Sequence, residues 1–170
     1  MANRKGTLVL AHDRITLIIE RFAHQILEHH PDAKELVLLG IHGHGAEIAS
    51  RINGYLSQLN PKLDIHSGVI HIDKESPLSA PPESDMEIAS LAGKHVILVD
   101  DVLNSGKTLV HALRWVLSDD VASVKTIVLV DRIHRSYPVK ADFVGMTLST
   151  TLQERVEVEM GADEDYAYLV

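Results

Sequence analysis

Hydrophobic residues follow two spacings along the chain, and each spacing predicts one kind of element. Between residues 13 and 30 they recur every three or four positions, which predicts an amphipathic helix that ends before Pro31. The continuous apolar run at residues 36–41 predicts a strand that is buried on both faces, as in a parallel sheet. The two patterns recur downstream. They predict one helix at residues 46–59 and another helix that ends at residue 117. They also predict strands at residues 62–72, 96–99, 123–130, 141–144 and 155–160, and an edge strand at residues 166–170.

This alternation of strands and helices predicts an α/β fold, in which right-handed crossovers join the strands of a parallel sheet. Residues 73–94 interrupt the pattern, because they carry three prolines, many charges and little periodicity. Irregular segments of this length inside a domain are usually functional, so we expect a lid loop at about residues 73–92. A disordered insert is the alternative interpretation.

Composition narrows the function classes. The 170 residues, 45% of them apolar and 4% aromatic, suit one domain spanning residues 1–170 with an aliphatic core. The absence of cysteine excludes disulfides, thiolate zinc sites and cysteine nucleophiles. A net charge of −8 disfavours polyanions unless a basic patch exists. The apolar run near the N-terminus is too short for a signal peptide or for a span of about 20 residues, so we expect a cytoplasmic protein that does not enter a membrane.

The segment VILVDDVLNSGKT at residues 96–108 carries the candidate chemistry. A buried strand ends in Asp100 and Asp101, and a turn containing Ser105 and Gly106 then opens a helix. Ligands of open α/β sheets bind at the carboxyl ends of strands, and a helix N-terminus holds phosphate. An acidic pair beside a phosphate cradle suits a ribose phosphate. The alternative is a solvated strand end followed by a serine that only caps the helix.

The same segment resembles the phosphoribosyl-pyrophosphate (PRPP) motif of type I phosphoribosyltransferases, and every defined position of that motif matches. Residues 22–28, 38–52 and 131–145 resemble, more narrowly, the pyrimidine-operon attenuator/uracil phosphoribosyltransferase family. The resemblance runs from about residue 10 to the C-terminus and is weakest in the lid segment. It implies the type I phosphoribosyltransferase fold, a parallel sheet flanked by helices with a small hood, here expected at residues 141–160.

The resemblance also implies a role for each matching residue. Asp100 and Asp101 would bind the ribose hydroxyls and, directly or through water, Mg²⁺. The lid would close over the substrates. The 5′-phosphate would be held by Asn104, Ser105, Gly106, Lys107 and Thr108. The pyrophosphate would be held by the loop His42, Gly43, His44 and Gly45. The base would be held by Asp131 and Arg132 together with Val156 and Glu157 of the hood.

The activity implied is transfer of phosphoribose from PRPP to a pyrimidine base, uracil, giving UMP and pyrophosphate with Mg²⁺ as cofactor. The transition state of such a transfer resembles an oxocarbenium ion. The protein therefore has to position two substrates, neutralise the leaving group and exclude water. The resemblance further implies a homodimer or a higher homo-oligomer.

The chain departs from the attenuator family in the pyrophosphate loop, where a Lys-Thr-Arg run is usual and His42-Gly43-His44 stands here. One lost donor of this kind can cost about 3 kcal/mol of transition-state stabilisation, although protonated histidines could substitute in part. A weakly catalytic or non-catalytic nucleotide sensor that regulates pyrimidine genes is therefore the alternative. A metal site on the two histidines lacks a third ligand in the sequence.

Two further positions bear on the base. Asn104 and Asp131 stand where 6-oxopurine phosphoribosyltransferases carry Asp and Lys, which argues against hypoxanthine and guanine. Asp131 followed by Arg132 agrees with the uracil pattern, while a surface charge cluster at residues 131–135 is the alternative.

RNA binding in the attenuator family uses the first helix, where Arg21 and His24 match. Glu20 replaces a neutral residue, and His29 stands where Arg is common. These two changes, on a chain with a net charge of −8, argue against an RNA partner. Surface or packing roles are expected for the remaining histidines considered: His12, His30, His66, His71, His95 and His111.

Overall fold

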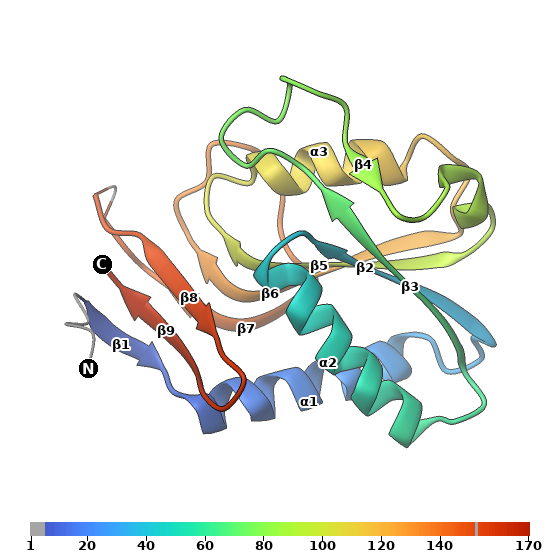
Figure 1. Cartoon of the computed structure of the whole chain (residues 1–170), viewed down its shortest axis with the longest axis horizontal. Helices are drawn as coiled ribbons and strands as arrows, with labels where there is room; N and C mark the ends of the chain where they lie inside the picture. The colour runs from blue at the N-terminus through green and yellow to red at the C-terminus, as the bar shows by residue number, and fades with distance from the viewer. Residues whose placement is uncertain (1–5, 152) are drawn as a thin grey trace.

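The computed structural model describes residues 6–151 and 153–170, which form two sheets (Figure 1). The large sheet has the strand order β4-β3-β2-β5-β6-β7, and all of its strands except β4 are parallel. Its strands are β2 (Glu35–Ile41), β3 (Asp64–His71), β4 (Glu83–Ser84), β5 (His95–Leu103), β6 (Ser123–Arg132) and β7 (Phe143–Leu148). The predicted α/β fold with a central parallel sheet is confirmed.

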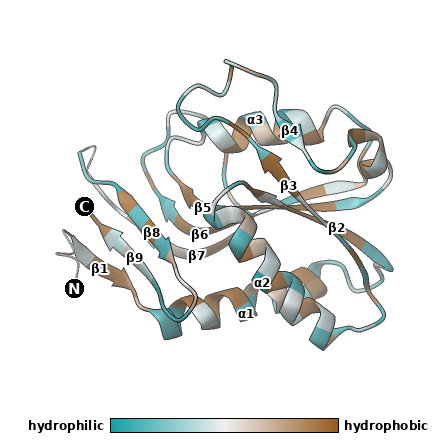
Figure 2. Cartoon of the chain, in the orientation of Figure 1, coloured by the Kyte–Doolittle hydropathy of each residue, from teal (hydrophilic) through white to brown (hydrophobic). Residues whose placement is uncertain are grey.

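Helices cover both faces of the large sheet. Alternate strand residues point to opposite faces: Leu36 and Leu38 pack with helices α1 (His12–His29) and α2 (His44–Leu59). Val37 and Leu39 pack with helix α3 (Lys107–Val116) and the 3₁₀ turn η1 (Ile88–Leu91). The continuous apolar runs in the sequence thus reflect burial on two sides (Figures 1 and 2).

The small sheet has the order β1-β9-β8, formed by β1 (Thr7–Leu10), β9 (Asp165–Leu169) and β8 (Val156–Met160). The edge position predicted for residues 166–170 is wrong. β9 is the central strand, because β1, which the pattern did not predict, pairs with its other side.

The segment expected to form the hood divides between the two sheets. Residues 143–148 form β7 at the edge of the large sheet, whereas residues 156–160 form β8 of the small sheet. The small sheet lies beside the carboxyl ends of β5 and β6 (Figure 1).

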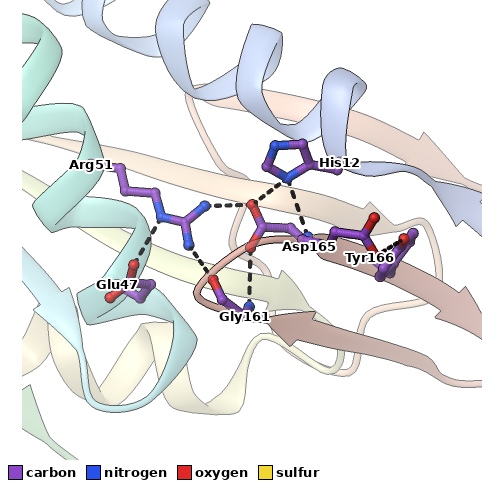
Figure 3. A network of polar contacts seen from close by, with 7 residues as sticks. His12, Glu47, Arg51, Gly161, Asp165 and Tyr166 are labelled. Atoms are coloured by element: carbon purple, nitrogen blue, oxygen red, sulfur yellow. Dashed lines mark hydrogen bonds and ion pairs between the residues drawn. The ribbon is translucent and has the colours of Figure 1, made fainter. Parts of the chain in front are cut away.

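A buried carboxylate attaches the small sheet to the helices (Figure 3). Asp165 at the start of β9 is fully buried and forms an ion pair with Arg51 of α2. The Arg51 guanidinium also donates to the carbonyl of Gly161 at 3.2 Å and to Glu47 at 2.8 Å, and His12 Nδ1 of α1 lies 3.3 Å from the Asp165 carboxylate. These contacts set the position of β8, which borders the candidate site.

The C-terminal part of the expected lid segment packs against β3. Within it, β4 pairs antiparallel with β3, and the Asp85 carboxylate accepts the Val69 N–H at 2.7 Å. Leu91 of η1 is fully buried. None of the helices in the described ranges 6–151 and 153–170 is both long enough and apolar enough to cross a bilayer.

Candidate active site

Asp100 and Asp101 form the centre of the site, near the carboxyl end of the central strand β5. The prediction that the strand ends at these residues is wrong, since β5 continues to Leu103. Asp100 is only 3% exposed, and Lys74, which follows β3, places its Nζ 3.0 Å from Asp100 Oδ1 and 3.2 Å from Asp101 Oδ1. The buried Asp100 and the partly buried Asp101 are therefore bridged by one ammonium group.

Burial and the neighbouring carboxylate give the two acids different proton affinities. Desolvation, and then repulsion by Asp101, raises the pKa of Asp100 to about 7, although Lys74 opposes the shift. Burial alone would also raise the pKa of Asp101, but the Lys74 ammonium and hydrogen bonds hold it below its ordinary value. Near neutral pH the pair can therefore hold one proton on Asp100 while Asp101 stays ionised.

The turn after β5 has the backbone geometry expected of an anion cradle. Gly106 adopts φ 86° at the start of α3, and a Cβ at this position would lie 2.6 Å from Val139 Cγ1. No side chain caps the helix at this residue. The Ser105 hydroxyl accepts a hydrogen bond from the Lys107 N–H at 3.2 Å, so part of the local capping role named as the alternative is present.

The acids and the turn share one cavity of about 270 Å³. The structure thereby brings together every residue predicted for the ribose and the 5′-phosphate, with Val156 of β8 closing one side. The cavity is lined by Lys74, Asp100, Asp101, Val102, Leu103, Asn104, Ser105, Gly106, Lys107, Thr108, Leu109, Val128 and Val156.

The predicted pyrophosphate loop lies next to this cavity, but its residues do not line it. It is also shorter than expected, because His44 and Gly45 already belong to the first turn of α2. Gly43 adopts φ 95°, where glycine is favoured. A Cβ on Gly45 would lie 2.7 Å from the Val99 carbonyl oxygen and 3.0 Å from Asp100 Cα, so the loop packs directly against β5 at the acid pair.

Asp131 and Arg132, both predicted to hold the base, have different surroundings. Asp131 near the end of β6 is 7% exposed and forms an ion pair with Arg135, which argues against a simple surface charge cluster. Its Oδ1 has no hydrogen-bond partner among the described residues. Arg132 donates to Asn104 Oδ1 at 3.0 Å and therefore contacts the phosphate cradle.

Of the two hood residues predicted for the base, only Val156 lines the cavity. Burial alternates along β8, so Val156 faces the cavity while Glu157 is exposed on the other face and pairs with Arg155 at 2.9 Å. A one-residue step along a strand reverses the direction of the side chain, which explains why only one of the two neighbours reaches the site.

The residues proposed for RNA lie on α1. Arg21 donates to the carbonyl oxygens of Val144 at 2.7 Å and Gly145 at 3.2 Å, both in β7. His24 is exposed on the same helix. The guanidinium thus already has partners within the chain.

Lys74, whose ammonium contacts both acids, was not among the residues predicted from the sequence. One available signal was its place just after β3: carboxyl ends of parallel strands meet at one edge of a sheet, so residues after 71 could reach residues after 99. A lysine in an irregular segment carries no periodic pattern that would distinguish it from a surface lysine.

The donor set suits Mg²⁺ better than a transition metal. The described residues contain no cluster of three or more His, Cys, Asp or Glu side chains that could enclose a metal ion. Asp100 and Asp101 offer oxygen ligands, and Mg²⁺ is commonly held by one or two carboxylates together with water and substrate phosphates. The site therefore fits a magnesium ion that shares its ligands with the substrate.

Comparisons with known proteins agree with this geometry. A family model described as a phosphoribosyl transferase domain matches residues 7–165. The "Bifunctional protein PyrR" of Actinobacillus pleuropneumoniae serotype 5b is 36% identical over 89% of this chain and 88% of its own. The protein of the same name from Deinococcus deserti is also 36% identical, over 94% and 90%.

Solved structures of two hypoxanthine-type enzymes share the fold. A hypoxanthine-guanine phosphoribosyltransferase of Bacillus anthracis has a TM-score of 0.72 at 20% identity and covers 85% of this chain and 83% of its own. The hypoxanthine phosphoribosyltransferase of Trypanosoma cruzi has a TM-score of 0.76 at 18% identity, with 95% of each chain covered. At such identities the match confirms the expected type I phosphoribosyltransferase fold and carries no information about the base.

Proposed function

Since the chain belongs to the phosphoribosyl transferase family, we propose that it transfers phosphoribose from PRPP to a pyrimidine base, uracil, and releases pyrophosphate. One observation carries the proposal: Asp100 and Asp101 share a cavity with the cradle at residues 104–108. Carboxylates accept hydrogen bonds from a sugar diol, and the amides at a helix N-terminus bind phosphate. A ribose 5-phosphate carries both a diol and a phosphate, so it can use both groups of this cavity.

The chain's own residues would act by positioning and electrostatics. Asp101, ionised beside Lys74, would accept from one ribose hydroxyl, while Asp100 can accept or donate according to its protonation. The cradle would hold the 5′-phosphate so that the anomeric carbon faces both the leaving pyrophosphate and the base. A bound Mg²⁺ would supply positive charge to the pyrophosphate oxygens, held by the two carboxylates.

The choice of uracil rests on residues near the end of β6. Asn104 and Asp131 stand where 6-oxopurine enzymes carry Asp and Lys, Asp131 followed by Arg132 agrees with the uracil pattern, and Arg132 donates to Asn104 of the cradle at 3.0 Å. The buried Asp131 Oδ1 lacks a partner among the described residues and could accept an N–H from a base. These features support a pyrimidine rather than a 6-oxopurine.

The proposal is tested by measuring pyrophosphate release from PRPP and Mg²⁺ with uracil, cytosine, hypoxanthine and guanine. We expect release with uracil and little with the purines. Asp101→Asn should lower turnover at least tenfold, whereas the exposed Asp32→Asn should leave it unchanged. If the folded protein binds neither PRPP nor UMP, the proposal is wrong.

The alternative is a nucleotide sensor that keeps the cavity but has little turnover, motivated by His42 and His44 in the pyrophosphate loop. Tight UMP binding without pyrophosphate release would favour the sensor. RNA binding gains no support from Arg21, which donates to β7 carbonyls. A low-salt mobility shift with a stem-loop RNA tests it, and sedimentation tests the proposed homo-oligomer.

A further inference from the structure

One cation of the expected lid segment is bound to the acid pair. The Lys74 ammonium lies 3.0 Å from Asp100 Oδ1 and 3.2 Å from Asp101 Oδ1, and all three residues line the same cavity. The same two oxygens also accept backbone N–H groups, Asp100 Oδ1 from Asp101 at 2.9 Å and Asp101 Oδ1 from Val102 at 2.8 Å. The carboxylates are therefore fixed in orientation, with one positive charge between them.

Lys74 can leave this position far more easily than the acids can lose a cation. Its side chain is 42% exposed, whereas the Asp100 side chain is 5% exposed and that of Asp101 15%. A lysine ammonium is strongly hydrated, so water can take over its hydrogen bonds. Buried carboxylates without a counter-charge are costly, so another cation has to replace the one that leaves.

The lid begins at Lys74 and is loosely packed beyond it. The Asp73 carboxylate accepts the N–H groups of the two residues after Lys74 at 2.9 and 3.0 Å, which forms a turn at this point. Residues of the segment 77–82 and Trp115 of α3 border a shared cavity of about 340 Å³, and Leu78 is 74% exposed. A segment with so few buried contacts opens at low cost in free energy. The contact of Lys74 with the acids joins this segment to β5.

We infer that Lys74 is an internal counter-ion that a divalent cation displaces from Asp100 and Asp101, and that this displacement releases the lid. The inference rests on the proposed function, in which the two carboxylates hold the metal. A metal ion on the remaining carboxylate oxygens would lie close to the ammonium, and like charges in a partly buried site repel one another. Lys74 thereby opposes metal binding and couples the position of the lid to the metal.

Binding of Mn²⁺ without substrate tests the competition, because Mn²⁺ prefers the same oxygen ligands as Mg²⁺ and electron paramagnetic resonance counts its free ions. The proteins compared are the wild type, Lys74→Met, Lys74→Arg and, as the matched control, Lys62→Met, which changes an exposed lysine before β3. All are measured above the pH at which Asp100 loses its proton. We expect Lys74→Met to bind Mn²⁺ about tenfold more tightly than the wild type, because the competing charge is removed. The control and Lys74→Arg, which keeps the charge, should bind as the wild type does.

Hydrogen exchange in residues 75–80 measures the release of the lid. The Ser79 N–H donates to the Ser76 carbonyl at 2.8 Å, and the Glu75 and Ser76 N–H groups donate to Asp73, so these amides report on the turn that contains Lys74. In the wild type, Mn²⁺ should speed exchange here several-fold. In Lys74→Met, exchange should already be fast and should not respond to Mn²⁺. A lysine that only stabilises the fold would give no metal-dependent change confined to this segment.

Equal Mn²⁺ affinity in the wild type and Lys74→Met would overturn the inference, and so would wild-type lid exchange that is the same with and without Mn²⁺. The wild-type exchange needs no variant, so it decides the matter even if Lys74→Met does not fold. Binding of UMP and PRPP to the wild type separates this inference from the proposed function. If neither binds while the Mn²⁺ difference persists, the proposed function is wrong and the counter-ion role of Lys74 is supported.

Discussion

Replacing Lys74 by methionine should destabilise the protein in a way that depends on pH. The ammonium lies 3.0 Å from Asp100 and 3.2 Å from Asp101, and methionine keeps much of the apolar stem but no charge. Losing one partner of a buried ion pair costs about 3–5 kcal/mol, and an exposed pair contributes about 1 kcal/mol or less. Because the Asp100 side chain is 5% exposed and that of Lys74 42%, we expect an intermediate loss of about 2 kcal/mol at pH 8.

The sign of the pH dependence follows from Asp100. Its pKa is raised from 3.8 to about 7, so the folded state binds more protons than the unfolded state between these values. Stability supplied by this proton is present below about pH 4 and is lost as the pH rises through about 7, with a slope of at most about 1.4 kcal/mol per pH unit. At pH 5 Asp100 is protonated, and Lys74→Met removes only the contact with Asp101.

Urea unfolding at pH 5 and pH 8 with a chelator present would measure both values, and the exposed Lys62→Met is the matched control. We expect a clearly larger loss at pH 8 than at pH 5 for Lys74→Met, and a change of less than about 0.5 kcal/mol for the control at either pH. Equal losses at both pH values would refute the assignment of the raised pKa to Asp100, and the absence of any loss would refute the ion pair itself.

Three other substitutions test the raised pKa of Asp100, the packing of Gly45 and the ion pair of Asp165. Asp100→Asn should flatten the rise in stability between pH 7 and pH 5, as followed by urea unfolding. Gly45→Ala should cost about 1–3 kcal/mol, because its Cβ would meet β5 backbone atoms at 2.7 and 3.0 Å, whereas Gly54→Ala, with open space around it in α2, should stabilise the helix by about 0.5–1 kcal/mol. Asp165→Asn should lower the free energy of unfolding by about 3 kcal/mol in a thermal melt, with the exposed Asp163→Asn as its neutral reference.

The local pattern of apolar residues was sufficient to predict most of the helices and strands. Apolar periodicity located the helices and the parallel strands because each element buries a face whose spacing is written in consecutive residues. The motif at residues 96–108 located the acid pair and the cradle for the same reason: a strand, a turn and a helix start that are contiguous in the chain stay close in space.

Other features depended on contacts between distant segments, which no local spacing encodes. Lys74 reaches the acids, and His71 meets His42, only because β3, β2 and β5 end at one edge of the sheet. β1 becomes a strand by pairing with β9, and the direction of Glu157 follows from the register of β8 against β9. Periodicity reports which face of an element is buried, whereas the packing of elements against one another sets which charged groups meet, and that arrangement governs the electrostatics of the site.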